Sequence, residues 1–158
     1  MQNHSAKTLN FRVAYIKVIF MKTRRFLPVI ISTLLFTTFV EAATTTTDLG
    51  ADSRQCVEYA RSRESTLPYG LTSWQSKKDI VNSWSCTAGS VAIIDSTSII
   101  AAGHVAVVEG CLDTKTSGAI RITETNWKKG RKTERRASSK TISGAQTELK
   151  IYGYYKKP

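Results

Sequence analysis

Histidine and cysteine are scarce in this sequence, which contains two histidines and three cysteines among 158 residues. His4 lies near the beginning of the chain, and His104 is the only other histidine. A catalytic zinc site usually takes three ligands from histidine, cysteine and carboxylate side chains. A single histidine beyond the N-terminal segment does not supply such a set, so we predict no metal and no other cofactor.

Long hydrophobic runs are also lacking. The uncharged apolar run Phe26–Val40, "FLPVIISTLLFTTFV", is shorter than the roughly 20 apolar residues that span a membrane. Lys22, Arg24 and Arg25 precede it, and small residues follow it in the pattern that signal peptidase recognises. These features predict a cleaved export signal and a secreted or periplasmic product, and an uncleaved anchor is the alternative.

The predicted signal peptide sets the domain boundaries. It occupies residues 1–42, with cleavage near Ala42–Ala43, and translation starting at Met21 would give it an ordinary length. The preceding twenty residues would then be an upstream extension. Small and polar residues over 43–52 predict a linker, and residues 53–158 are expected to form one catalytic domain.

Positive charge is in excess. The chain has a formal net charge of +11, and residues 1–42 hold six of its 23 basic and one of its 12 acidic residues, which leaves +6 for the rest. This charge suits anionic cell-wall polymers, anionic lipid or nucleic acid, or serves solubility alone. The basic run at 128–136, "KKGRKTERR", is expected to be a solvated loop rather than a nucleic-acid site. We therefore expect no nucleic-acid partner, no stable membrane span after cleavage, and a monomer.

The pattern of apolar residues changes from helical to alternating near Gly89. Asp52 or Ser53 is expected to cap a first helix over 54–64, and a second helix is expected over 73–84. The expected strands are Ser90–Asp95, Gly103–Gly110, Ala119–Trp127 and Leu149–Tyr155. Helices followed by consecutive short strands predict an α+β domain in which the helices pack on an antiparallel sheet.

The three cysteines cannot all pair within one chain. Cys86 precedes one predicted strand and Cys111 follows the next, so the two fall close to one register if those strands form a hairpin. Export to an oxidising compartment favours disulfides, and we therefore predict a Cys86–Cys111 bridge. Cys56 then remains the free thiol.

Cys56 is placed where a thiol can be activated. The N-terminus of a helix lowers a thiol pKa, and Arg54 is expected to add to this effect. A thiol that attacks an acyl group also needs an imidazole to transfer its proton. His104 is the available imidazole, although a histidine at a strand edge with no catalytic role is the alternative.

Two polar residues share a face of the strand expected over Ala119–Trp127. Alternation places Glu124 and Asn126 at the end of a face that is otherwise apolar. One of them could orient His104, and the other could bind substrate or a developing oxyanion. Ordinary polarity at a strand end is the alternative explanation.

These residues lie in segments that resemble one known family, the CHAP domain, which comprises cysteine, histidine-dependent amidohydrolases/peptidases. The resemblance covers about Ser53–Tyr155 and rests on these segments in family order: "QCVEYAR", "LPYGLTSW", "TAGSVAIID", "AGHVAVVEG" and "ITETNW". It implies a papain-like fold shared with NlpC-type peptidases. It also implies hydrolysis of peptidoglycan amides by an N-acetylmuramoyl-L-alanine amidase or a peptide endopeptidase.

Carried over residue by residue, the resemblance assigns five roles. Cys56 matches the nucleophile, His104 the general base and acid, Glu124 the group that orients His104, and Asn126 a fourth polar member of the site. Gln55 is a candidate oxyanion donor, with the Cys56 backbone N–H as the other. A non-catalytic cationic module that binds cell walls and a secreted antibacterial amidase toxin are the alternative functions.

Overall fold

The computed structural model describes residues 42–97 and 100–158. Its elements in chain order are β1 (Ala43–Ala51), α1 (Cys56–Arg63), α2 (Trp74–Asp79), β2 (Val91–Ile94), β3 (His104–Asp113), β4 (Gly118–Thr125), β5 (Arg131–Ser139), α3 (Ile142–Glu148) and β6 (Ile151–Tyr155). The predicted signal peptide, apart from Ala42, lies outside the described residues, as does the predicted start at Met21.

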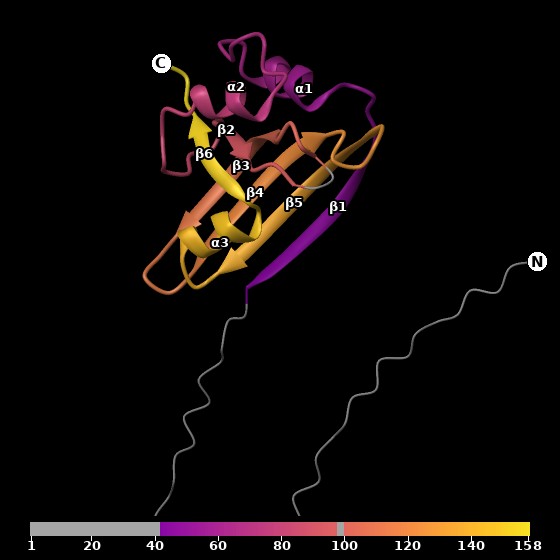
Figure 1. Ribbon diagram of the computed structural model, residues 1–158. Helices are drawn as coiled ribbons and strands as arrows, with labels where there is room; N and C mark the ends of the chain where they lie inside the picture. Colours follow the sequence, from indigo (N-terminus) through magenta and orange to yellow (C-terminus); the bar gives the residue numbers. More distant parts are fainter. Residues whose placement is uncertain (1–41, 98–99) are drawn as a thin grey trace, which may run out of the picture. The chain divides into compact units, whose positions relative to one another are not determined.

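One antiparallel sheet organises residues 42–158. Its six strands follow the order β1-β5-β4-β3-β2-β6 (Figure 1), and every paired strand is antiparallel. The predicted α+β class is therefore confirmed. The papain-like character of the fold stays a prediction.

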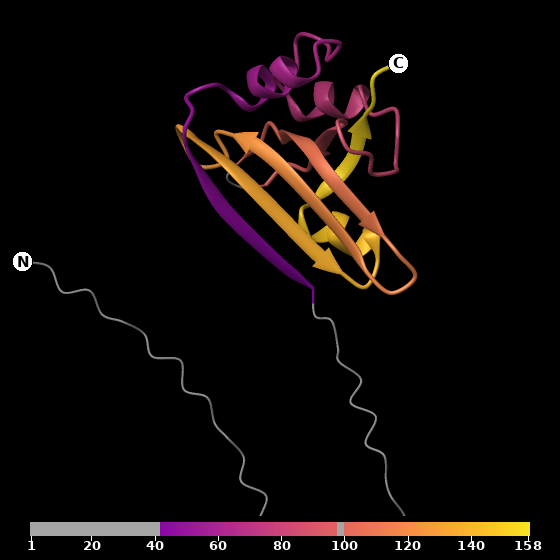
Figure 2. The same cartoon turned by 180° about the vertical axis from the view of Figure 1, so that it is seen from behind.

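The sheet has two buried faces, and helices cover both. All four residues of β2 are buried, and alternation along the strand divides them between two apolar clusters. Val91 and Ile93 pack with residues of α1, whereas Ala92 and Ile94 pack with Ala145 of α3. Figures 1 and 2 show α1 and α3 over different parts of the sheet.

Two segments differ from the sequence-based expectation. The predicted linker at 43–52 is mostly strand β1, which pairs with β5 along its length, because its threonines are β-branched residues that suit a strand. The basic run at 128–136 is not a solvated loop throughout, since β5 begins at Arg131. Thr133 and Arg135 alternate with more exposed neighbours and are themselves buried.

Three helices lie within the described residues, and the two that were predicted differ from the prediction in their bounds. Helix α1 begins at Cys56 rather than at residue 54, and α2 ends at Asp79, well before residue 84. Helix α3 was not predicted. Thr141 caps α3 by accepting a hydrogen bond of 3.0 Å from the Gly144 N–H.

A disulfide joins Cys86 to Cys111, as predicted, with the Cα atoms 6.0 Å apart. Strand β3 continues through Cys111 to Asp113, and β2 pairs with its first part, so that His104 lies opposite Ile94. The predicted hairpin is therefore present, and Cys56 is the free cysteine. Such a bond is typical of proteins that fold outside the reducing cytosol.

Within residues 42–97 and 100–158, every helix is too short or too polar to cross a lipid bilayer.

Candidate active site

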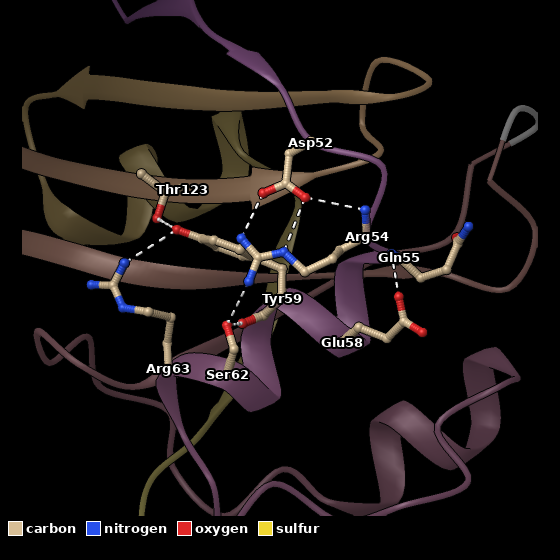
Figure 3. A network of polar contacts seen from close by, with 8 residues as sticks. All are labelled: Asp52, Arg54, Gln55, Glu58, Tyr59, Ser62, Arg63 and Thr123. Atoms are coloured by element: carbon tan, nitrogen blue, oxygen red, sulfur yellow. Dashed lines mark hydrogen bonds and ion pairs between the residues drawn. The ribbon is translucent and has the colours of Figure 1, made fainter.

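Cys56 is the first residue of α1, and a local hydrogen bond fixes this end of the helix. Gln55 is the N-cap, and its backbone N–H donates a hydrogen bond of 2.8 Å to Glu58 in the first turn (Figure 3). The expected caps Asp52 and Ser53 are therefore wrong. Asp52 instead accepts hydrogen bonds of 3.0 and 2.6 Å from the Arg54 guanidinium.

A buried tyrosine docks α1 on the sheet. The Tyr59 hydroxyl lies 3.0 Å from Thr123 Oγ1 of β4, and Arg63 donates to the same hydroxyl from the next turn (Figure 3). Arg54 donates to Ser62 on the outer side of the helix. These contacts hold the Cys56 end of α1 beside the sheet.

Three neighbouring strands bring three ionisable side chains together on one face of the sheet. Strand β3 pairs with β4 so that Val107 lies opposite Thr123, and the same register makes His104 a diagonal neighbour of Glu124. Strand β4 pairs with β5 so that Ile122 lies opposite Arg135, which makes Arg135 a diagonal neighbour of Glu124 on the other side. Diagonal neighbours on one face are within reach of long side chains. The row His104, Glu124, Arg135 therefore follows from strand register.

Glu124 is completely buried, and its carboxylate contacts both neighbours. Arg135 Nε lies 2.5 Å from Glu124 Oε1, and the Arg135 Nη2 group donates to Oε2 at 2.9 Å. His104 Nε2 lies 3.1 Å from Oε2, but its N–H is not aligned for a straight hydrogen bond. The two side chains are nevertheless close enough for each to stabilise the charged form of the other. Burial raises the pKa of Glu124, and His104 and Arg135 together bring that pKa below its ordinary value.

Arg135 and Trp127 complete the surroundings of His104. The Arg135 guanidinium lies 3.8 Å from the centre of the Trp127 ring, and the edge of Trp127 contacts the His104 ring at a centroid distance of 5.4 Å. Sequence reasoning missed both residues. Buried residues alternate with more exposed ones from Thr133 to Ala137, but this part of the sequence is basic and has no apolar alternation that would have indicated a buried Arg135.

Cys56 and His104 shift the pKa of one another in opposite directions. Burial raises the pKa of the Cys56 thiol, but a hydrogen bond with His104, the charge of His104, the Val105 N–H and Lys77 bring it below its ordinary value. Burial lowers the pKa of His104, but Cys56 and Glu124 raise it to about 8. Each group therefore stabilises the charged form of the other. Arg54, which was expected to assist, is instead engaged by Asp52.

Asn126 does not reach the row of charged residues. It has a φ of 63° directly after β4 ends at Thr125, so the strand alternation no longer sets its direction. Its Nδ2 donates a hydrogen bond of 2.8 Å to Gln55 Oε1. Asn126 therefore links the end of β4 to the N-cap of α1.

A cleft of about 890 Å³ opens beside these residues. Its lining includes Gln55, Cys56, His104, Asn126 and Trp127. All of the predicted site residues except the buried Glu124 thus border one cleft, and Glu124 lies directly behind His104.

No cluster of three or more histidine, cysteine or acidic side chains that could hold a metal ion occurs within the described part of the chain. The residues at the cleft and directly beside His104 supply a thiol, an imidazole and a buried carboxylate. This set suits nucleophilic attack on a carbonyl carbon with proton transfer to a leaving group.

Comparison with family models gives one match, the CHAP domain, over residues 46–126. The chain belongs to the CHAP family. The match covers just over half of the 158 residues and includes Gln55, Cys56, His104, Glu124 and Asn126. Neither the comparison with curated proteins nor that with solved structures found a match.

CHAP membership places the protein among amidases and peptidases of the peptidoglycan-hydrolase type. The match ends at residue 126, before Trp127 and Arg135. The matched region therefore includes Gln55, Cys56, His104 and Asn126 of the cleft. Trp127, which also borders the cleft, and Arg135, which contacts Glu124, come from the segment that follows the match.

Proposed function

We propose that this CHAP protein is an exported peptidoglycan hydrolase that cleaves an amide bond with Cys56 as the nucleophile. The bond is either that between N-acetylmuramic acid and L-alanine or one within the peptide. The observation that carries the proposal is the contact between Cys56 and His104, in which each group stabilises the charged form of the other.

In the proposed reaction the Cys56 thiolate attacks the carbonyl carbon of the amide, and the carbonyl electrons move to the oxygen. The C–N bond then breaks as the His104 imidazolium gives its proton to the leaving amine, which leaves a thioester on Cys56 and a neutral imidazole. His104 next removes a proton from water as the water attacks the thioester. Release of the carboxylic acid restores the thiolate and the imidazolium.

Gln55 is suited to the oxyanion of the tetrahedral intermediate. Its Oε1 accepts a hydrogen bond from Asn126. This bond fixes the carboxamide so that its Nε2 donor points away from Asn126. The Cys56 backbone N–H lies in the first turn of α1, where helix N–H groups have no partner within the helix. These two donors form a pair of the kind that stabilises oxyanions, and the proposed role of Asn126 is to orient Gln55.

Contacts between β5 and other parts of the domain argue against the alternative function, in which a non-catalytic module would bind wall polymers through the basic segment at 128–136. Arg131 is paired with Asp48, Lys132 lies over the Tyr59 ring, and Arg135 is buried against Glu124. Much of the positive charge of this segment is thus already engaged within the domain.

The test is hydrolysis of purified sacculi by the mature protein and by the variant Cys56→Ala. We expect the variant to lose at least about a thousandfold in rate, with the circular dichroism spectrum and the Cys86–Cys111 bond retained. Undiminished lysis by the variant would refute the proposal. Mass analysis of the products decides the bond, since an amidase frees the amino group of L-alanine and an endopeptidase frees one within the stem or bridge peptide.

A further inference from the structure

The cleft carries positive charge without any acidic side chain to balance it. Its charged lining residues are Arg61, Lys77 and Lys129, and no aspartate or glutamate is among the described residues that line it. Arg61 donates to the backbone carbonyls of Leu67 and Pro68. These carbonyls are uncharged and do not neutralise the Arg61 guanidinium, so its positive charge still contributes to the electrostatic potential in the cleft.

Lys77 is the most unusual of these cations because it is only 2% exposed. It projects from the short helix α2, where it is the one buried residue. Its Nζ donates a hydrogen bond of 2.7 Å to the Ala102 carbonyl oxygen. No ion pair joins Lys77 to an acidic side chain in the part of the chain that the structure describes.

A buried ammonium group is costly without an anion or enough hydrogen-bond acceptors. An ammonium has three N–H donors, and the Ala102 carbonyl occupies one of them. The Cys56 thiolate is the nearby negative charge, since Cys56 and Lys77 interact electrostatically. That charge disappears when Cys56 becomes a thioester, so the need of Lys77 for an anion is greatest during the reaction itself.

We propose that Lys77 forms a subsite for a free carboxylate of the substrate, on a residue adjoining the amide that is cleaved. The inference rests on the proposed function and specifies its substrate class, an anionic peptide. A residue linked through its side-chain carbonyl, such as an isoglutamyl residue, has a free carboxylate close to the scissile carbonyl. Lys77, beside Cys56 and with donors to spare, is placed to bind such a group.

The test uses matched muropeptides that keep the sugar and the stem peptide, so that amidase and endopeptidase activities are both detected. Two pairs are needed, each comparing a carboxylate with the uncharged carboxamide of the same shape. One pair differs at the residue that supplies the scissile carbonyl, and the other differs at the residue that supplies the amine. The readout is the ratio of kcat/KM within each pair.

We expect the unmodified protein to prefer the carboxylate by on the order of tenfold or more in one pair. Lys77→Met should abolish this preference, whereas Lys129→Met, which removes an exposed cation from the same cleft, should retain it. Should Lys77→Met fail to fold, Lys77→Gln is the second variant, because it keeps a donor for the Ala102 carbonyl. It should also abolish the preference for the carboxylate.

Two results would overturn the inference and leave the proposed function standing. The first is equal hydrolysis of both members of each pair by the unmodified protein. The second is a variant of Lys77 that slows both members by one factor and keeps their ratio, since Lys77 would then act only on the Cys56 thiolate. Failure of the unmodified protein to hydrolyse sacculi would instead refute the proposed function, and the inference with it.

Discussion

Arg135 holds both carboxylate oxygens of Glu124 from the neighbouring strand, at 2.5 and 2.9 Å, and both side chains are buried. Glu124 in turn faces His104. The position of the His104 imidazole, which contacts Cys56, therefore depends on a residue outside the part of the chain that matches the CHAP family.

Replacing Arg135 should reduce both stability and turnover. Arg135→Met leaves the Glu124 carboxylate buried beside an apolar side chain, and breaking a buried pair in this way costs about 3–5 kcal/mol. We expect kcat for sacculi or muropeptides to fall while KM changes little, because Arg135 orients catalytic groups and does not border the cleft. Denaturant unfolding and steady-state kinetics measure the two effects.

The matched control is Arg136→Met, on the exposed side of the same strand, which should change stability by less than about 0.5 kcal/mol. The double variant Glu124→Gln with Arg135→Met should recover part of the stability lost in Arg135→Met, since no carboxylate is then left buried without its guanidinium. An Arg135→Met protein with the stability and kcat of the unmodified protein would contradict a positioning role.

Activity should depend on pH in a bell-shaped manner. The thiolate is lost as the pH falls through the lowered pKa of Cys56, and the imidazolium is lost as the pH rises through the pKa of His104 at about 8. A profile of kcat/KM against pH should therefore decline above about pH 8. A rate that continues to rise through pH 9 would indicate an ordinary thiol and no ion pair.

The same ion pair should be visible in the titration of His104. Its folded pKa lies above the ordinary value of 6.5, so the stabilisation it provides is complete below about pH 6.5 and is lost as the pH rises through about 8. In Cys56→Ala the partner that raises this pKa most is missing. Proton NMR of the imidazole should then give a lower pKa than in the unmodified protein, and an unchanged pKa would contradict the contact.

The Cys86–Cys111 bond should contribute to stability and little to catalysis. It closes a loop with a sequence separation of 25, for which loop-closure entropy gives about 3.5 kcal/mol. The double variant Cys86→Ser with Cys111→Ser should unfold at a correspondingly lower denaturant concentration. Its kcat at low temperature should stay within about twofold of the unmodified value, and a loss comparable to that of Cys56→Ala would show that the bond shapes the site.

Gly103, directly before His104, should not tolerate a side chain. Its φ is +66°, and a Cβ there would lie 2.6 Å from Trp74 Cε3. Gly103→Ala should cost about 1–3 kcal/mol and lower kcat by displacing His104. Gly110→Ala, within β3 and with no atom within 4 Å of the added Cβ, is the control. Equal stability of the two variants in denaturant unfolding would contradict the prediction.

Local patterns in the sequence, together with the resemblance to the CHAP family, were sufficient to select Gln55, Cys56, His104 and Asn126, which border the cleft. The change from helical to alternating periodicity indicated the α+β class, and the placement of Cys86 and Cys111 beside two short strands indicated their bond, which the structure contains. The alternation of Ile120, Ile122 and Glu124 likewise placed a carboxylate on the His104 side of β4.

What the sequence did not reveal depends on contacts between distant segments. Arg135 lies in a run of basic residues whose composition suggests solvent exposure, and only its register opposite Ile122 brings it to Glu124. Burial of Lys77 depends on how α2 meets the Ala102 carbonyl, 25 residues away. The strand at Ala43–Ala51 forms because β5 is present to pair with it.

The row of Cys56, His104, Glu124 and Arg135 also determines how charge is balanced during the proposed cycle. At rest, a thiolate, an imidazolium, a carboxylate and a guanidinium sum to zero. In the thioester intermediate the sulfur and the imidazole are both neutral, and Glu124 still balances Arg135, so the sum is again zero. These four groups therefore exchange protons with the substrate during the proposed cycle without accumulating net charge.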